Sequence, residues 1–179
     1  MNPFCIVFIV LYLGVLISYF FSETSGNHKR IAINKIILAS MFLVFGIVMY
    51  CLHYDFFSIH LIMLLAIIVA YVGDVWLLYS FTKGGISFIV SNVLFFSYEW
   101  ILVGMNNVPF SRIWWFIPLF MLTWGTFLTL TILKVLNFKT KTIPILSYVC
   151  SVSLHGTLGL ALAAYFANTK MILFGVGLF

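Results

Sequence analysis

Six apolar segments, each about as long as a lipid bilayer is thick, limit what this chain of 179 residues can fold into. A transmembrane helix needs about 20 mainly apolar residues, whereas a transmembrane strand needs only about 10. Because backbone groups in a bilayer must be hydrogen-bonded within the protein, segments of this length predict helices and not the alternating strands of a barrel. The predicted spans are 3–21, 31–52, 59–81, 86–105, 113–133 and 143–166.

The composition also indicates an integral membrane protein. Hydrophobic residues make up 64% of the chain and charged residues 7%, whereas about 25% of the residues in soluble domains are charged. The polar breaks are too short to hold a soluble domain, so any chemistry must take place within the helices. The sequence therefore predicts an all-α, polytopic membrane helix bundle that forms one transmembrane domain over residues 1–179. Residues 171–179 would add a partial seventh span.

The basic residues predict how the bundle is oriented. Cytoplasmic loops carry an excess of Lys and Arg, and the side on which the odd-numbered spans end holds most of them. The amino terminus is therefore predicted to be non-cytoplasmic, in a multi-pass protein of a bacterial inner membrane or a eukaryotic endomembrane. The net charge of +5 reflects this orientation, and no nucleic-acid partner is expected. The cytoplasmic set is Lys29, Arg30, Lys35, Lys83, Lys134, Lys139 and Lys141, against Arg112 and Lys170 on the other side.

Asp74 is unusual because it follows Gly73 inside the third apolar segment, in a chain with only four acidic residues. An ionisable group at membrane depth costs at least about 2.5 kcal/mol and usually faces a bundle interior or a wet cavity. Two interpretations remain open: a structural ion pair with Lys35, and an acid that donates a proton, because a low-dielectric pocket favours the protonated form of a carboxyl group. The second is favoured, since a purely structural ion pair at this depth is costly.

Four polar residues on four segments fall at a similar depth. At a rise of about 1.5 Å per residue, Lys35 and Asp74 lie about 6 Å and 10 Å from the cytoplasmic edge of their spans. By the same rise, Asn92 and Tyr148 lie about 9 Å and 8 Å deep. The shared level predicts a common pocket that opens toward the cytoplasmic leaflet, if the helices are rotated so that these side chains face one another.

The sixth segment carries a polar stripe formed by Ser147, Ser151 and His155, with Tyr148 beside it. Residues four apart share one face of a helix, so this face is predicted to point inward, with Ser151 in the pocket wall. The serines fit ordinary helix packing equally well. His155 lies deeper, about 18 Å from the cytoplasmic edge, and a lone membrane histidine is more often an interhelical donor than a catalyst.

Glu99 lies on the same helix face as Asn92 but near the outer end of its span. It is too far from Asp74 in depth to be its partner, and two roles stay open: a carboxylate among the lipid headgroups and a group that lines a cavity. His53 and His60 are seven residues apart across a loop, unlike the four-residue spacing of two helical metal ligands. No metal site and no cofactor are expected.

The order of these residues resembles the YhhN family, multi-spanning membrane proteins that include the mammalian lysoplasmalogenases. The resemblance covers most of the chain, and its most specific motif is the Gly-Asp pair in its place within the span pattern. The shared features are Lys35 opening the second span, Gly73 and Asp74 followed by 75–78, the turn glycines Gly84 and Gly85, Phe88 four residues before Asn92, and Tyr148 early in the sixth span.

This resemblance implies an eight-helix fold and hydrolysis of the vinyl ether bond of lysoplasmalogens to a fatty aldehyde and a glycerophospho-ethanolamine or glycerophosphocholine. Asp74 matches the family's Gly-Asp carboxylate and is its candidate catalytic acid. Lys35 matches the family's lysine, which would hold the phosphate or tune the acid. Asn92, Tyr148 and Ser151 complete the candidate substrate-binding set.

The chain departs from the family pattern in three places. The family usually has His where Asn92 stands, Tyr where Phe95 stands, and a second carboxylate in a Ser-Asp motif soon after a stretch like 175–179. If the chain ends at residue 179, a lipid-binding protein with little or no hydrolase activity is expected. If the chain continues, the second carboxylate would lie about 15 Å from the outer edge, near the level of Asp74.

The sequence thus predicts a membrane-embedded hydrolase whose partners are a lysophospholipid substrate and the surrounding lipids. Two alternatives remain. A small-molecule or proton-coupled transporter would use a membrane Asp and Lys equally naturally, although no clear internal repeat is present. A non-catalytic lipid-binding or structural membrane protein would tolerate replacement of both residues.

Overall fold

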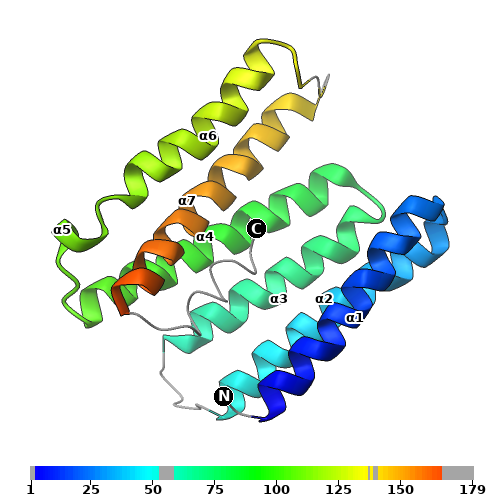
Figure 1. Ribbon diagram of the computed structural model, residues 1–179, viewed down its shortest axis with the longest axis horizontal. Helices are drawn as coiled ribbons and strands as arrows, with labels where there is room; N and C mark the ends of the chain where they lie inside the picture. Colours follow the sequence, from blue (N-terminus) through cyan, green and yellow to red (C-terminus); the bar gives the residue numbers. More distant parts are fainter. Residues whose placement is uncertain (1–2, 53–58, 137, 139–140, 167–179) are drawn as a thin grey trace. The chain divides into compact units, whose positions relative to one another are not determined.

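The computed structural model describes residues 3–52, 59–136, 138 and 141–166. Over these residues the chain is almost entirely helical and contains no strand, as predicted (Figure 1). The helices are α1 (Pro3–Ser25), α2 (His28–Leu52), α3 (His60–Leu77), α4 (Phe81–Met105), α5 (Phe110–Ile113), α6 (Phe116–Ile132) and α7 (Thr142–Phe166).

Four helices within the described part of the chain, α2, α3, α4 and α7, are long and apolar enough to cross a membrane. The described apolar parts of α1 and α6 are shorter, Val10–Ser25 and Phe116–Ile132. The helical membrane class is therefore supported, while six complete crossings stay a prediction. The partial seventh span expected at 171–179 lies outside the described residues.

The chain divides into two compact units, Met1–Gly84 (unit 1) and Gly85–Phe179 (unit 2), and each is described by itself. A single transmembrane domain over the whole chain stays a prediction. Unit 1 holds α1, α2, α3 and the first residues of α4, and unit 2 holds the rest of α4 with α5, α6 and α7.

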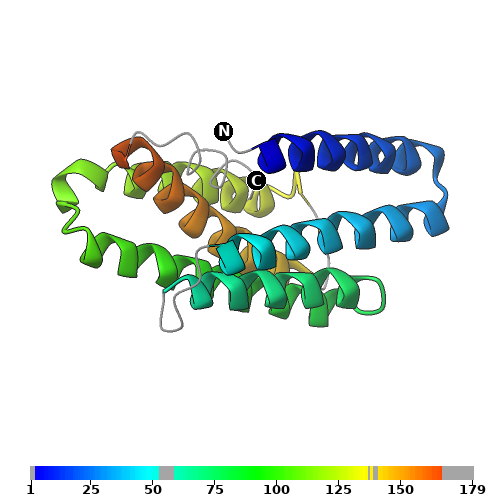
Figure 2. The ribbon, with the colours of Figure 1, turned by 90° about the horizontal axis from the view of Figure 1, so that it is seen from below.

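The turn between α1 and α2 is much shorter than the polar break expected at 22–30 (Figure 2). Only Gly26 and Asn27 separate the two helices. Gly26 has a φ of +64°, a left-handed conformation that glycine adopts without a steric penalty and that commonly ends helices. The side-chain Oδ1 of Asn27 accepts a hydrogen bond from the Arg30 N–H at 3.2 Å and so caps the start of α2.

In unit 1, α1 packs against α2 and α2 packs against α3. The first pair is antiparallel, because the Phe8 ring stacks on Phe45 with the centroids 4.4 Å apart, while Ser22 contacts Asn34. Small residues let the second pair approach closely. A side chain at Gly46 would place its Cβ 2.7 Å from the Cδ1 atom of Ile67 on α3.

The turn between α3 and α4 lies at 78–80 and not at the two glycines, which belong to the first turn and a half of α4. Gly84 is buried against the end of α3, where an added Cβ would lie 2.5 Å from Leu77 Cγ and 2.9 Å from the Leu77 backbone N. Gly85 has nothing within 4 Å of such an atom. The two neighbouring glycines therefore play different roles.

We expect Gly84→Ala to destabilise the protein by about 1–3 kcal/mol, because forcing a methyl group into a tight contact displaces the packed backbone. Gly85→Ala is the matched control, and its higher helix propensity is expected to leave stability unchanged or raise it by up to about 1 kcal/mol. Thermal unfolding in detergent, followed by circular dichroism, measures both. Equal midpoints for the two variants would contradict this description of the turn.

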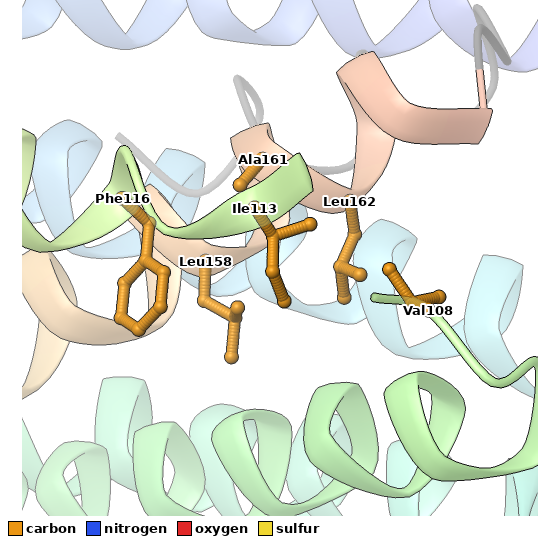
Figure 3. Close-up of a cluster of buried hydrophobic side chains, with 6 residues drawn as sticks. All are labelled: Val108, Ile113, Phe116, Leu158, Ala161 and Leu162. Atoms are coloured by element: carbon orange, nitrogen blue, oxygen red, sulfur yellow. The ribbon is translucent and has the colours of Figure 1, made fainter. Parts of the chain in front are cut away.

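In unit 2, α7 packs closely against α6 and also contacts α5. Pro109 precedes α5, and this short helix carries Ile113 into a cluster of buried apolar side chains. Figure 3 shows Ile113 between Leu158 and Leu162 of α7. The cluster, which joins α5, α6 and α7 near one end of the unit, consists of Val108, Ile113, Phe116, Leu158, Ala161 and Leu162.

The threonines of α6 satisfy their hydroxyl groups within the helix. Each donates to the carbonyl oxygen four residues before it, at 2.6–3.1 Å. This local bonding removes the need for an outside partner, so α6 can face an apolar medium despite its polar residues. The four residues are Thr123, Thr126, Thr129 and Thr131.

Candidate functional site

The acid in the third apolar segment lies beside the lysine of the second. Lys35 Nζ on α2 is 3.7 Å from Asp74 Oδ1 on α3. Each side chain is 27% exposed, so the pair is partly buried but not sealed. Gly73, the residue before Asp74, is buried. The ion pair considered from the sequence is therefore present.

Helix α1 contributes polar groups to unit 1 as well. Tyr12 and Tyr19 of α1 lie within electrostatic range of the Asp74 carboxylate. Next to Lys35, the Asn34 side-chain amide donates to Ser22 Oγ at 2.8 Å and lies 3.2 Å from Ser18 Oγ. The sequence analysis did not predict this contribution of α1. Ser18 and Ser22, four residues apart in an apolar helix, could have indicated a polar face there.

Three of the predicted substrate-binding residues meet in unit 2. The Asn92 side-chain amide on α4 donates to Ser151 Oγ on α7 at 3.0 Å. Ser151 in turn donates to the backbone oxygen of Tyr148 at 2.8 Å. The Tyr148 ring packs edge-on against Phe88, with the centroids 5.8 Å apart. Asn92 is buried, so its amide links the two helices, while Tyr148 is exposed.

A second ionisable pair, which sequence reasoning missed, also joins α4 and α7. Glu99 Oε1 lies 2.8 Å from His155 Nδ1, and both side chains are at most 3% exposed. The imidazole stacks on Phe95, with the ring centroids 5.0 Å apart and an angle of 12° between the planes. Glu99 is therefore buried in a pair and does not sit among lipid headgroups, one of the two roles left open for it.

The contacts between α4 and α7 follow a single register. Phe88 meets Tyr148, Asn92 meets Ser151 and Phe95 meets His155, so residue numbers rise together along both helices. The two helices are therefore parallel where they meet. Of the predicted polar stripe, Ser151 and His155 contact α4, whereas Ser147 is exposed. Of the four residues predicted to share a pocket, Lys35 and Asp74 belong to unit 1, whereas Asn92 and Tyr148 belong to unit 2.

An apolar groove of about 390 Å³ lies between α1 and α2. At 100° of rotation per helical residue, Lys35 lies on roughly the opposite side of α2 from the groove wall. The groove is therefore separate from the ion pair. It is lined by Val7, Phe8, Leu11, Ile36, Ile37, Ser40, Met41 and Val44.

Metal-ligating side chains do not gather anywhere in the described ranges: no three His, Cys, Asp or Glu residues come together there. Cys51 is exposed and Cys150 is partly buried, and both are free thiols. His53 lies outside the described residues.

Comparisons of the chain with models of protein families, with curated proteins and with solved structures found no match. The resemblance to the YhhN family therefore remains an interpretation of individual residues.

Proposed function

We propose that this protein is a membrane-embedded hydrolase that cleaves the vinyl ether bond of lysoplasmalogen-type lysophospholipids, with Asp74 as the general acid. The observation that carries the proposal is the Lys35–Asp74 pair, an ammonium 3.7 Å from a carboxyl group between two apolar helices. Its partial exposure leaves the carboxyl group reachable, and ionisable residues within membrane helices usually mark functional sites. The YhhN-like placement of Gly73 and Asp74 supplies the reaction class.

The chemistry of a vinyl ether suits acid catalysis by a protonated carboxyl group. Asp74 would donate its proton to the vinyl carbon distal to the ether oxygen, which gives an oxocarbenium ion. The resulting Asp74 carboxylate would stabilise that cation. Water then adds to the cationic carbon and loses a proton, and the hemiacetal collapses to a fatty aldehyde and the glycerophospho-alcohol. Lys35 would contact the phosphate of the substrate or shift the balance between the protonated and ionised forms of Asp74.

Within unit 2, Asn92, Tyr148 and Ser151 are proposed to hydrogen-bond to the polar part of a lipid. Asn92 already bonds to Ser151, so a ligand would use the second amide hydrogen or the amide oxygen of Asn92. Tyr148 is the most accessible of the three.

The test is release of aldehyde from an alkenyl lysophospholipid by the purified protein in detergent. The matched substrate is the alkyl ether lysophospholipid of the same chain length, which lacks the double bond and cannot form the oxocarbenium ion by protonation at carbon. Release from the alkenyl substrate alone supports the proposal. Absence of aldehyde from both substrates, with protein that is folded by circular dichroism, contradicts it.

A proton-coupled or small-molecule transporter is the second candidate. The buried Glu99–His155 pair favours it, because chains of Asp, Glu and His residues within membrane helices often form proton relays. A lipid-binding protein without catalysis is the remaining alternative. Reconstituted vesicles that show substrate-dependent proton movement, but no aldehyde release, would favour the transporter.

The proposed membrane arrangement has several crossings and a non-cytoplasmic amino terminus. We expect a cysteine introduced at Glu23, near the end of α1, to be labelled by a membrane-impermeant maleimide only from the cytoplasmic side. A cysteine introduced at Asn106, after α4, should be labelled only from the other side. Both variants would be made in a background with Cys5, Cys51 and Cys150 replaced by Ser. Labelling of both from one side contradicts the arrangement.

A further inference from the structure

The Glu99–His155 pair in unit 2 has no role in the proposed ether hydrolysis. Glu99 Oε1 lies 2.8 Å from His155 Nδ1, a close contact that lacks the alignment of a hydrogen bond. The other oxygen, Oε2, is buried and has no hydrogen-bond partner among the residues that the structure describes. A buried polar atom left without a partner costs about 1–3 kcal/mol, and more if it is charged. The free oxygen therefore requires an explanation.

The surroundings of the pair limit what can occupy Oε2. Phe95 covers one face of the imidazole. Tyr98 on α4 is the other titratable group in electrostatic contact with Glu99. The sequence of α6 contains no titratable residue, and Arg112 of α5 is exposed. Among the described residues, His155 lies within ion-pair distance of the Glu99 carboxyl group.

We propose that Glu99 and His155 form a proton-binding site, in which Oε2 of Glu99 exchanges a proton with water while Oε1 stays close to the His155 ring. On protonation, an O–H bond of a hydronium ion breaks, an O–H bond forms at a lone pair of Oε2, and a water molecule is left; on deprotonation the reverse occurs. The ring, held by Phe95, remains the fixed partner in both states. This site consists of residues of unit 2 alone, and the proposal does not depend on whether the protein hydrolyses ether lipids.

The number of carboxyl groups makes this proposal measurable. The chain has only four acidic side chains, Glu23, Asp55, Asp74 and Glu99. Infrared difference spectra of the detergent-solubilised full chain, recorded between acidic and alkaline pH, would show the C=O stretching band of each carboxyl group that gains a proton. We expect one such band to shift in D₂O, to disappear in Glu99→Gln and to persist in Asp74→Asn and Glu23→Gln.

Two outcomes would overturn the proposal. One is the absence of a titrating band that Glu99→Gln removes. The other, which remains informative if Glu99→Gln fails to fold, is a His155→Gln variant in which every carboxyl band keeps its position and its midpoint pH. A purely structural pair predicts the first of these outcomes, because a carboxylate fixed in one state neither titrates nor exchanges. Loss of the band in Glu99→Gln, together with intact aldehyde release by the same variant, would support the proton-binding site and leave the hydrolase proposal unaffected.

Discussion

Replacing Asp74 with Asn is expected to lower the rate of aldehyde release by about 10²- to 10⁴-fold, the usual contribution of a positioned general acid. Asn has nearly the shape of Asp and can still accept a hydrogen bond from Lys35, but its amide N–H groups are not acidic enough to protonate the vinyl carbon. Initial rates of aldehyde release from the alkenyl lysophospholipid measure the effect. Glu23→Gln, which removes an exposed carboxylate that accepts a hydrogen bond from Tyr19 on its own helix, is the matched control. Equal rates for wild type and Asp74→Asn would remove Asp74 from the mechanism.

The Lys35–Asp74 pair can also be tested for a purely structural role. Lys35→Met alone leaves the Asp74 carboxylate without its ammonium partner, whereas Lys35→Met combined with Asp74→Asn removes both charges. If the pair only joins α2 to α3, the double variant should be stable and as active as wild type. If Asp74 is the acid, the double variant should be stable but inactive. Thermal midpoints and aldehyde rates, recorded on the same preparations, separate the two results.

Glu99→Ala is expected to destabilise the protein by about 3–5 kcal/mol, the range found when one partner of a buried ion pair is removed. The reason is that His155 would keep its buried position and lose the carboxylate 2.8 Å away. Unfolding in detergent, followed by denaturant titration, measures the loss. Glu23→Ala provides the comparison, since exposed substitutions usually change stability by no more than about 0.5 kcal/mol.

A double-mutant cycle with His155→Ala extends this prediction. Because the two residues are in contact, the combined loss should be smaller than the sum of the single losses. Additive losses would mean that Glu99 and His155 stabilise the fold independently, and that the short distance between them contributes little.

Much of the fold could be predicted because apolar length and breaks are properties of the sequence itself. Each of the six predicted full spans corresponds to a helix, but their boundaries were less accurate. The sequence suggested a turn at Gly84 and Gly85, whereas α4 already begins at Phe81. The two glycines looked alike in sequence, and only the position of Leu77 distinguishes them.

The sites were predicted unevenly because depth follows from the sequence and helix rotation does not. Depth placed Lys35 near Asp74, and the structure pairs them. The same rise places Glu99 about 20 Å and His155 about 18 Å from the cytoplasmic edge. Depth alone therefore also predicts that these two residues lie at a similar level. The pair was not predicted because the sequence does not show which face of α4 points toward α7. That orientation depends on how the helices pack.

The two-residue connection through Gly26 and Asn27 has a consequence for how the chain would enter a bilayer. Such a link is too short for α1 and α2 to insert one at a time on independent paths, so we expect them to enter together as a helical hairpin. Lys29 and Arg30 lie at the tip of that hairpin. Carrying each of them through the hydrocarbon would cost about 2.5–3.5 kcal/mol, so the tip should stay on the side where the protein is synthesised.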